Sequence, residues 1–213
     1  GTVRDLLASR RGSGLAKDTV RLARAALSVV LSSAVDDGLL PSNPALGFRQ
    51  ARADRQSEQE KTERIRPFTE EELGTFLGVA EKLEPRCAPY FWALAHAGLR
   101  PGEGLGLQAD DLDFDKRLLP IERAISDGEV GSTKTGQRRT VDLSRALERR
   151  LRSHLRWRKE EKLARGWPEM PSWLFFTTTG TPLDIHNTAK AFKRCLKEAG
   201  IESPHSPYDL RHG

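Results

Sequence analysis

The chain has 213 residues, of which 37% are hydrophobic and 31% charged, and its 35 Lys and Arg against 30 Asp and Glu give a formal net charge of +5. This composition is too polar for one densely packed domain, and it predicts one large or two small domains with solvated segments. No apolar run is long enough to span a membrane, and no secretory leader is recognisable. The excess positive charge is compatible with a polyanionic partner but does not identify one.

The two cysteines, Cys87 and Cys195, lie in apolar, helix-like surroundings without the spacing of a metal or redox motif. Such cysteines are typical of the reduced interior of an intracellular protein. The five histidines form no cluster of metal ligands either. We therefore expect a cytoplasmic protein without a metal or other cofactor.

The first predicted element is a helix over 18–37, in which apolar residues recur every three or four positions. Gly38 ends this helix, and the segment 41–44 forms a turn that excludes further helix. A single amphipathic helix cannot bury its apolar face alone, so residues 1–48 are expected to be part of a helical bundle. Arg21 and Arg24 lie off the apolar stripe, where they are either solvated charges or contacts to an anionic partner.

Residues 49–66 contain almost no large apolar side chain and mix both charge signs, which is typical of an interdomain linker. A second unit over 67–213 then begins. Thr69 and Glu72 have the spacing of a capping box at the start of a helix that Pro85 ends. The run 89–97 is a more uniformly apolar helix, which is expected to be buried.

Residues 97–107, Ala-Gly-Leu-Arg-Pro-Gly-Glu-Gly-Leu-Gly-Leu, join two predicted helices. Gly98 can end the first because glycine adopts the left-handed conformation at little steric cost, and Pro101 suits the first turn of the second. Arg100 is therefore held at a junction, and Glu103 follows three residues later on the same helix face. On spacing alone this is an ordinary surface ion pair.

After residue 107 the pattern changes from helix to short strands. Strands are expected at 118–121, 124–125 and 139–143, with a glycine-containing loop over 126–131 and a short β-prone step at 133–135. Lys134 therefore lies on or beside a β-hairpin. The remaining predicted elements are a long basic helix at 144–165, a short buried strand at 173–176 and a helix at 185–199. The expected class is mainly α with a small antiparallel β-sheet (α+β).

Three short sequence motifs resemble those of a known family. They are Arg100 with Glu103 three residues later, Thr-Lys134-Thr-Gly, and Pro-Tyr208-Asp-Leu-Arg211-His. Together they resemble the tyrosine recombinases, also called the phage integrase family. The resemblance covers 68–213 as the catalytic domain with its DNA breaking-rejoining fold. More weakly, it covers 2–47 as the last part of the helical, SAM-like core-binding domain, which binds DNA.

The resemblance implies a site-specific DNA recombinase or integrase in which a tyrosine hydroxyl attacks a backbone phosphate and forms a 3′-phosphotyrosyl link. Arg100 and Arg211 would hold the phosphate oxygens, because guanidinium forks bind them bidentately and stay charged at any relevant pH. Lys134 would act as the general acid for the leaving 5′ oxygen, and Glu103 would orient Arg100. The bond energy is retained in the link, so no ATP and no metal are implied.

The chain departs from the family pattern at two places. Tyr208 stands where the family usually has histidine, and tyrosine can bond to a phosphate oxygen but carries protons poorly near neutral pH. The family's nucleophilic tyrosine lies beyond the second arginine, whereas here only Gly213 follows His212. The sequence has two tyrosines, Tyr90 in a predicted core helix and Tyr208 in the place of the histidine. We therefore expect an inactive fragment of a protein whose nucleophile lies elsewhere.

Two interpretations of the function stay open. In the first, the chain is part of a recombinase that binds double-stranded DNA and works, when full length, as a homo-tetramer on two DNA sites. In the alternative, it is a catalytically inert DNA-binding protein derived from a recombinase. A metal-dependent nuclease or a helical regulator would leave Arg100, Lys134 and Arg211 unexplained. No membrane partner is expected.

Overall fold

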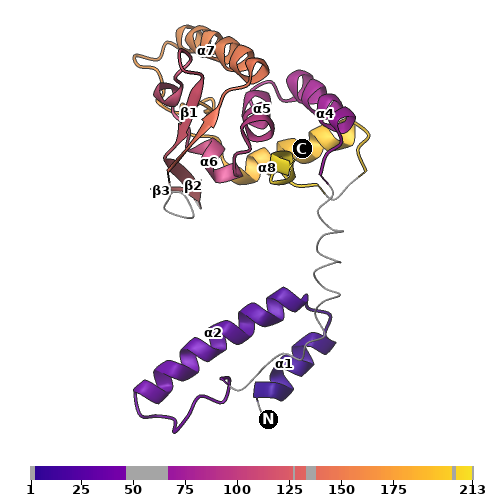
Figure 1. Cartoon of the computed structure of the whole chain (residues 1–213), viewed down its shortest axis with the longest axis vertical. Coiled ribbons are helices and arrows are strands. Elements are labelled where there is room, and N and C mark those ends of the chain that lie inside the picture. The colour runs from indigo at the N-terminus through magenta and orange to yellow at the C-terminus, as the bar shows by residue number, and fades with distance from the viewer. Residues whose placement is uncertain (1–2, 47–66, 127, 133–137, 203–204, 213) are drawn as a thin grey trace. The chain divides into compact units, whose positions relative to one another are not determined.

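The computed structural model describes residues 3–46, 67–126, 128–132, 138–202 and 205–212 (Figure 1). The chain divides into two compact units, Gly1–Glu60 and Lys61–Gly213. The division falls within residues 49–66, which the sequence predicts as a linker and which lie outside the described residues. In the described ranges no helix is both long and apolar enough to cross a membrane.

The first unit contains α1 (Val3–Gly12) and α2 (Lys17–Asp36), which contact each other. The sequence predicted α2 to within one residue at each end, but it did not predict α1. The turn after α2 folds back on the helix, because Nδ2 of Asn43 donates to the Ser28 carbonyl and to Oγ of Ser32, each at 2.8 Å. Val20 is buried, but Val30 on the same predicted stripe is 66% exposed, so the described residues cover this stripe only in part.

The second unit is built around the apolar helix α5 (Ala88–Ala97), which was predicted to be buried. Helices α4 (Glu70–Leu83) and α7 (Arg145–Arg165) pack against α5, and α8 (Ile185–Glu198) packs against α4. The interior is aromatic, and the rings of Phe76, Phe91 and Phe192 have centroids 4.8 to 5.8 Å apart. Burying such rings is the main favourable term in holding these helices together.

The helix ends follow signals that can be read in the sequence. Oγ1 of Thr69 accepts a hydrogen bond from the Glu72 amide at 3.1 Å, and Oε2 of Glu72 accepts one from the Thr69 amide at 3.0 Å. This is the predicted capping box. At α8, Oδ1 of Asp184 accepts a hydrogen bond from the Asn187 amide at 2.8 Å and caps the helix. Each such cap stabilises the fold by about 1 kcal/mol.

The strands form two antiparallel pairs, beside α6 and α7 in the view of Figure 1. β1 (Leu118–Ile121) pairs with β4 (Arg139–Asp142), and β2 (Arg123–Ser126) pairs with β3 (Glu129–Ser132). The α+β class is confirmed. The prediction of a loop over 126–131 is wrong, because β3 occupies much of it. Gly128, with φ of 80°, follows an aspartate in the Asp-Gly pair that two-residue hairpin turns favour, and this signal was missed.

Residues 173–176 do not form the predicted strand. Trp173 makes an isolated bridge to Gln108, and Phe176 makes another to Pro182. The two ends of the run therefore meet different neighbours, and no continuous ladder can form. Leu174, like Phe176, is buried as expected.

Candidate active site

The turn between α5 and α6 (Pro101–Leu105) places Arg100, and it is built as the sequence predicts. Gly98 ends α5 with φ of 58° and ψ of 38°, the left-handed conformation that favours glycine. Arg100 is the N-cap residue of α6 in an extended conformation, and Pro101 occupies the first helical position. Arg100 is thus fixed by the end of one helix and the start of the next.

Glu103 is the centre of this corner, and its side chain is only 2% exposed. Its Oε1 accepts a hydrogen bond from Nη1 of Arg100, and its Oε2 accepts one from the Arg100 amide, each at 2.8 Å. Arg139, the first residue of β4, adds a two-pronged contact, with Nη1 to Oε1 at 2.8 Å and Nη2 to Oε2 at 2.7 Å. The interpretation of residues 100 and 103 as an ordinary surface pair is therefore wrong, because the carboxylate is buried and four donors surround it.

The pKa of Glu103 reflects this environment. Burial alone would raise it, but hydrogen bonds from Arg139 and from the backbone and side chain of Arg100 outweigh the burial and lower the pKa to about 2. The pKa of Arg100 is raised, first by its hydrogen bond to Glu103 and also by one that involves the hydroxyl of Tyr208. Arg100 and Glu103 are therefore both charged at neutral pH.

Two glycines allow α6 to lie directly on β2. A Cβ atom at Gly102 would lie 2.6 Å from the carbonyl oxygen of Ile125, and one at Gly106 would lie 3.1 Å from Cα of Ala124. On the side facing the core, a Cβ atom at Gly104 would lie 2.9 Å from a ring carbon of Tyr90. The glycine-rich stretch thus fixes the position of Glu103 by close contact on two sides.

Arg211 reaches the same corner from the other end of the second unit. It lies in η2 (Asp209–His212), which packs against α5. Its Cγ is 4.0 Å from the place that a Cβ atom would take at Gly98, two residues before Arg100. Nη1 of Arg211 is buried and has no hydrogen-bond partner among the described residues. An unpartnered buried donor is costly, so this atom is suited to receive an acceptor from a ligand.

A groove of about 680 Å³ opens over this corner. Arg100 and Glu103 line it from α6, the β2–β3 hairpin lines it from another side, and Tyr208 contributes from the segment before η2. Tyr208 is 44% exposed. The structure therefore brings Arg100, Glu103, Tyr208 and Arg211 to one region, although more than a hundred residues separate the first pair from the second.

The other predicted site residues lie elsewhere or outside the described chain. Lys134 falls in the stretch 133–137, between β3 and β4, which lies outside the described residues. Arg21 and Arg24 lie on α2 of the first unit. His205, three residues before Tyr208, is buried with its ring stacked on Phe68 at 4.0 Å between centroids.

Tyr90 belongs to the core, as expected. Its side chain has no exposed surface, and its hydroxyl donates a hydrogen bond to the Pro101 carbonyl at 3.2 Å. Burial raises its pKa far above the ordinary value of tyrosine. A phenol in this position cannot reach a DNA backbone.

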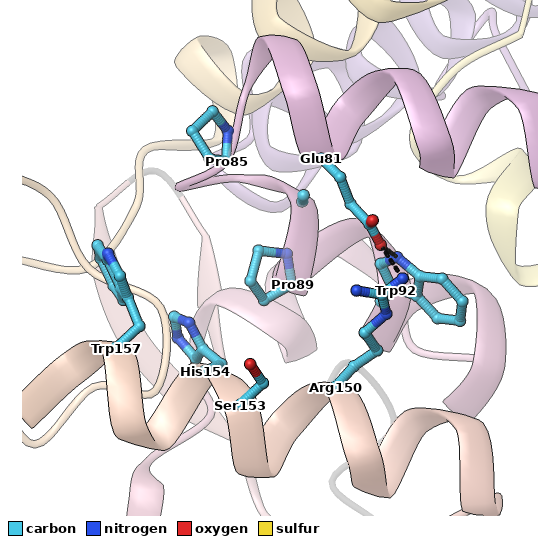
Figure 2. A pocket seen from close by; sticks show the side chains of 9 residues that line it. Glu81, Pro85, Pro89, Trp92, Arg150, Ser153, His154 and Trp157 are labelled. Carbon is cyan, nitrogen blue, oxygen red and sulfur yellow. Dashed lines mark hydrogen bonds and ion pairs between the residues drawn. The ribbon is translucent and has the colours of Figure 1, made fainter.

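A second hollow, of about 300 Å³, lies between α4, α5 and α7 (Figure 2). Its charged groups are already paired, because Glu81 accepts a hydrogen bond from the Trp92 indole at 2.9 Å and forms an ion pair with Arg150. Nε2 of His154 donates to the Leu174 carbonyl at 2.8 Å, and burial lowers its pKa to about 4, so it is neutral at pH 7. This hollow has no charge left to attract a phosphate.

Sequence reasoning missed Arg139. The signal available was weak, since a single arginine at the start of a short strand is ordinary in a chain with 35 Lys and Arg. Its contact with Glu103 spans 36 residues and depends on the pairing of β1 with β4, where Ile121 lies opposite Arg139.

Comparison with solved structures gives the class of fold. The Tn1549 transposon integrase, solved in complex with a circular intermediate DNA, superposes with a TM-score of 0.76 at 20% identity and covers 98% of this chain and 68% of that one. A lambda integrase dimer bound to a COC′ core site gives 0.68 at 18% identity, over 98% of this chain and 53% of that one. At such identities the likeness concerns the fold, which is that of the tyrosine recombinase catalytic domain.

The sequence comparisons give the family. The profile of the phage integrase family matches residues 66–213, and the chain belongs to this family. A tyrosine recombinase XerC-like protein of Caldanaerobacter subterraneus subsp. tengcongensis is 28% identical over 207 residues, which are 88% of this chain and 52% of that protein. The putative integrase/recombinase y4rB of Sinorhizobium fredii is 32% identical over 127 residues, 57% of this chain and 37% of that protein. The chain thus spans about half, or less, of the length of these relatives.

Proposed function

We propose that this chain holds the scissile phosphate of double-stranded DNA in a site-specific recombinase, which cleaves and rejoins strands through a 3′-phosphotyrosyl intermediate. The observation that carries the proposal is that Arg100 lines the groove, while Arg211, with a buried Nη1 that has no partner among the described residues, packs against Gly98 two residues before Arg100. Two guanidinium groups can share the equatorial phosphate oxygens, where negative charge grows during transfer.

The proposed step breaks one phosphodiester bond and forms another. The phenolic oxygen of a tyrosine attacks phosphorus and gives its proton to water, while the bond from phosphorus to the 5′ oxygen breaks. That 5′ oxygen takes up a proton, which we assign to Lys134 as donor. In the reverse direction a 5′ hydroxyl attacks the phosphotyrosyl ester, so no external energy source is needed. Arg100 and Arg211 stabilise the charge that develops between these states.

We assign the nucleophile to neither tyrosine of these 213 residues. Tyr90 is buried and its hydroxyl is engaged by the Pro101 carbonyl. Tyr208 is exposed, but its hydroxyl interacts with Arg100, so we assign it the role of a second donor to the phosphate. The alternative function, an inert DNA-binding protein that kept the phosphate site, has the same arginines without cleavage.

Trapping of a covalent complex separates these functions. The protein at its natural length is mixed with a pool of nicked random-sequence duplexes, and protein–DNA complexes that survive SDS are counted. We expect complexes with the unchanged protein and a loss of about 100- to 1,000-fold with Arg100→Ala or Arg211→Ala, the range for removing one preorganised donor. Adducts that persist in both variants would refute the assigned site. DNA binding without any adduct would select the inert alternative.

We further propose that residues 1–48 act as a partial core-binding domain and that Arg21 and Arg24 contact DNA phosphates. Each lost phosphate contact lowers the slope of log affinity against log salt by about 0.9. Replacing both arginines by alanine should therefore lower the slope by about 2 for any duplex sequence. An unchanged slope would place these two side chains away from DNA.

A homo-tetramer on two DNA sites remains part of the proposal and is tested by sedimentation with duplex DNA.

A further inference from the structure

The Glu103 carboxylate is shared between two arginines, and only one of them lines the groove. Arg100 is among the lining residues, whereas Arg139 contacts Glu103 from β4. We propose that Arg139 is a positioning residue: it compensates the charge of Glu103, so that the positive charge of Arg100 remains available to a DNA phosphate. This inference rests on the proposed function, because it assigns the role of Arg139 through Arg100.

The geometry of the contact supports this role. A carboxylate has about four lone-pair positions, and in Glu103 the backbone and side chain of Arg100 fill two of them while the fork of Arg139 fills the other two. Nη2 of Arg139 also donates to the Gly98 carbonyl at 3.4 Å, at the end of α5. Arg139 therefore joins β4 to both sides of the corner that presents Arg100.

The count of charges gives the functional consequence. Arg100 and Glu103 alone form a neutral pair, which attracts a phosphate weakly. With Arg139 the three side chains carry one net positive charge, and they do so around a carboxylate that is only 2% exposed. Burial strengthens electrostatic interactions, so this net positive charge attracts a phosphate in the groove more strongly than the same charge would in solvent.

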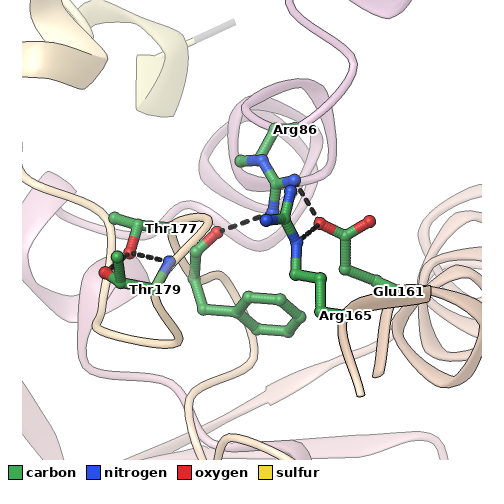
Figure 3. Close-up of polar contacts among 6 residues, drawn as sticks. Arg86, Glu161, Arg165, Thr177 and Thr179 are labelled. Carbon is green, nitrogen blue, oxygen red and sulfur yellow. Dashed lines mark hydrogen bonds and ion pairs between the residues drawn. The ribbon is translucent and has the colours of Figure 1, made fainter. Parts of the chain in front are cut away.

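The chain contains a matched control for this arrangement. Arg86 and Arg165 converge on Oε1 of Glu161, so that site also has two arginines on one glutamate (Figure 3). The Arg86 side chain is 25% exposed, close to the 28% of Arg100 and the 32% of Arg139. Neither Arg86 nor Arg165 lines the groove. Replacing Arg86 therefore removes a similar ion pair without touching the proposed phosphate site.

The test measures the affinity of the intact protein for a 30-base-pair duplex across a series of salt concentrations. Arg100→Ala should lower the slope of log affinity against log salt by about 0.9, the value for one phosphate contact. Arg139→Gln should lower it by a similar amount, because the neutral pair remains. Combining Arg139→Gln with Glu103→Gln should restore most of the slope, since Arg100 is then uncompensated. Arg139→Lys, which keeps the charge, should retain most of it, and Arg86→Gln should leave the slope unchanged.

The outcomes distinguish a failure of the proposed function from a failure of the inference on Arg139. Thermal unfolding of each variant confirms that the compared proteins are folded. If Arg100→Ala leaves both the slope and adduct formation unchanged, the proposed function fails and the inference fails with it. If Arg100→Ala has its effect but Arg139→Gln does not, or if the double variant binds no better than Arg139→Gln, only the inference on Arg139 is overturned. A structural role alone would make the double variant worse than either single change.

Discussion

Gly102 and Ile125 are in direct backbone contact: a Cβ atom at residue 102 would lie 2.6 Å from the Ile125 carbonyl oxygen. Real Cβ atoms do not approach this closely, and the obstacle is backbone rather than a flexible side chain. The helix that presents Arg100 and Glu103 can therefore sit on β2 only because residue 102 is glycine. The close contact sets the position of the corner relative to the hairpin that lines the groove.

Gly102→Ala is expected to destabilise the protein by about 1–3 kcal/mol, the usual cost of forcing an extra carbon into a packed interface. Because α6 must move away from β2, DNA affinity should fall as well. Gly78→Ala is the matched control, since Gly78 lies within α4 with no atom within 4 Å of its added Cβ, and it should stabilise by about 0.5–1 kcal/mol. Urea unfolding measures the change in stability for each of the two variants. Equal effects of the two changes would show that the contact with Ile125 does not matter.

The parts of the fold that follow from neighbouring residues could be predicted from the sequence. The Thr69 capping box, the left-handed Gly98 and Pro101 at the start of α6 were all predicted, because each acts within a few positions along the chain. Residues 173–176 were misassigned for the complementary reason. Their partners, Gln108 and Pro182, are set by packing between distant segments, which no local pattern contains.

In the candidate site too, the sequence predicted the local contact but not the contacts between distant segments. The three-residue spacing of Arg100 and Glu103 predicted their contact, but burial of the carboxylate depends on β4 and could not be read from that spacing. The fork of Arg139 and the approach of Arg211 to Gly98 both join segments far apart in the sequence. From the sequence, only the family resemblance predicted that Arg100 and Arg211 belong to the same site.

Glu103→Gln should be among the most destabilising single changes near the groove. It leaves two partly buried guanidinium groups without a carboxylate, and breaking such a cluster costs about 3–5 kcal/mol. Glu161→Gln, at a carboxylate whose side chain is 14% exposed, should cost about 1 kcal/mol or less. Urea unfolding at pH 7 gives both values, and a cost for Glu103→Gln as small as that for Glu161→Gln would contradict the tight coordination.

The same carboxylate predicts a pH dependence. Its pKa of about 2 in the folded protein lies below the ordinary 4.5, so the unfolded state binds the proton more readily. The stability that Glu103 contributes should be complete above pH 4.5 and should be lost as the pH falls toward 2. In Glu103→Gln this part of the acid sensitivity should be absent. Melting temperatures of the two proteins should therefore converge as the pH is lowered.

His154 should make stability depend on pH in a higher range. Its pKa is lowered from 6.5 to about 4 by burial, so the unfolded state takes up a proton between these values and the folded state does not. Stability should be full above pH 6.5 and should decline as the pH falls toward 4. His154→Gln retains a donor for the Leu174 carbonyl but does not titrate, so its melting temperature should fall less over this range. A titration of the His154 imidazole itself near 6.5 in the NMR spectrum of the folded protein would refute the prediction.

Tyr208→Phe tests the hydroxyl that interacts with Arg100. The ring stays, and the residue is 44% exposed, so the free energy of unfolding should change by less than about 0.5 kcal/mol. Adduct formation by the intact protein should fall about 10- to 100-fold, because the phosphate loses one hydrogen-bond donor in the transition state. Tyr208→His keeps a donor in reach and should recover most of this loss. A Phe variant that forms adducts at the unchanged rate would show that the Tyr208 hydroxyl has no part in the reaction.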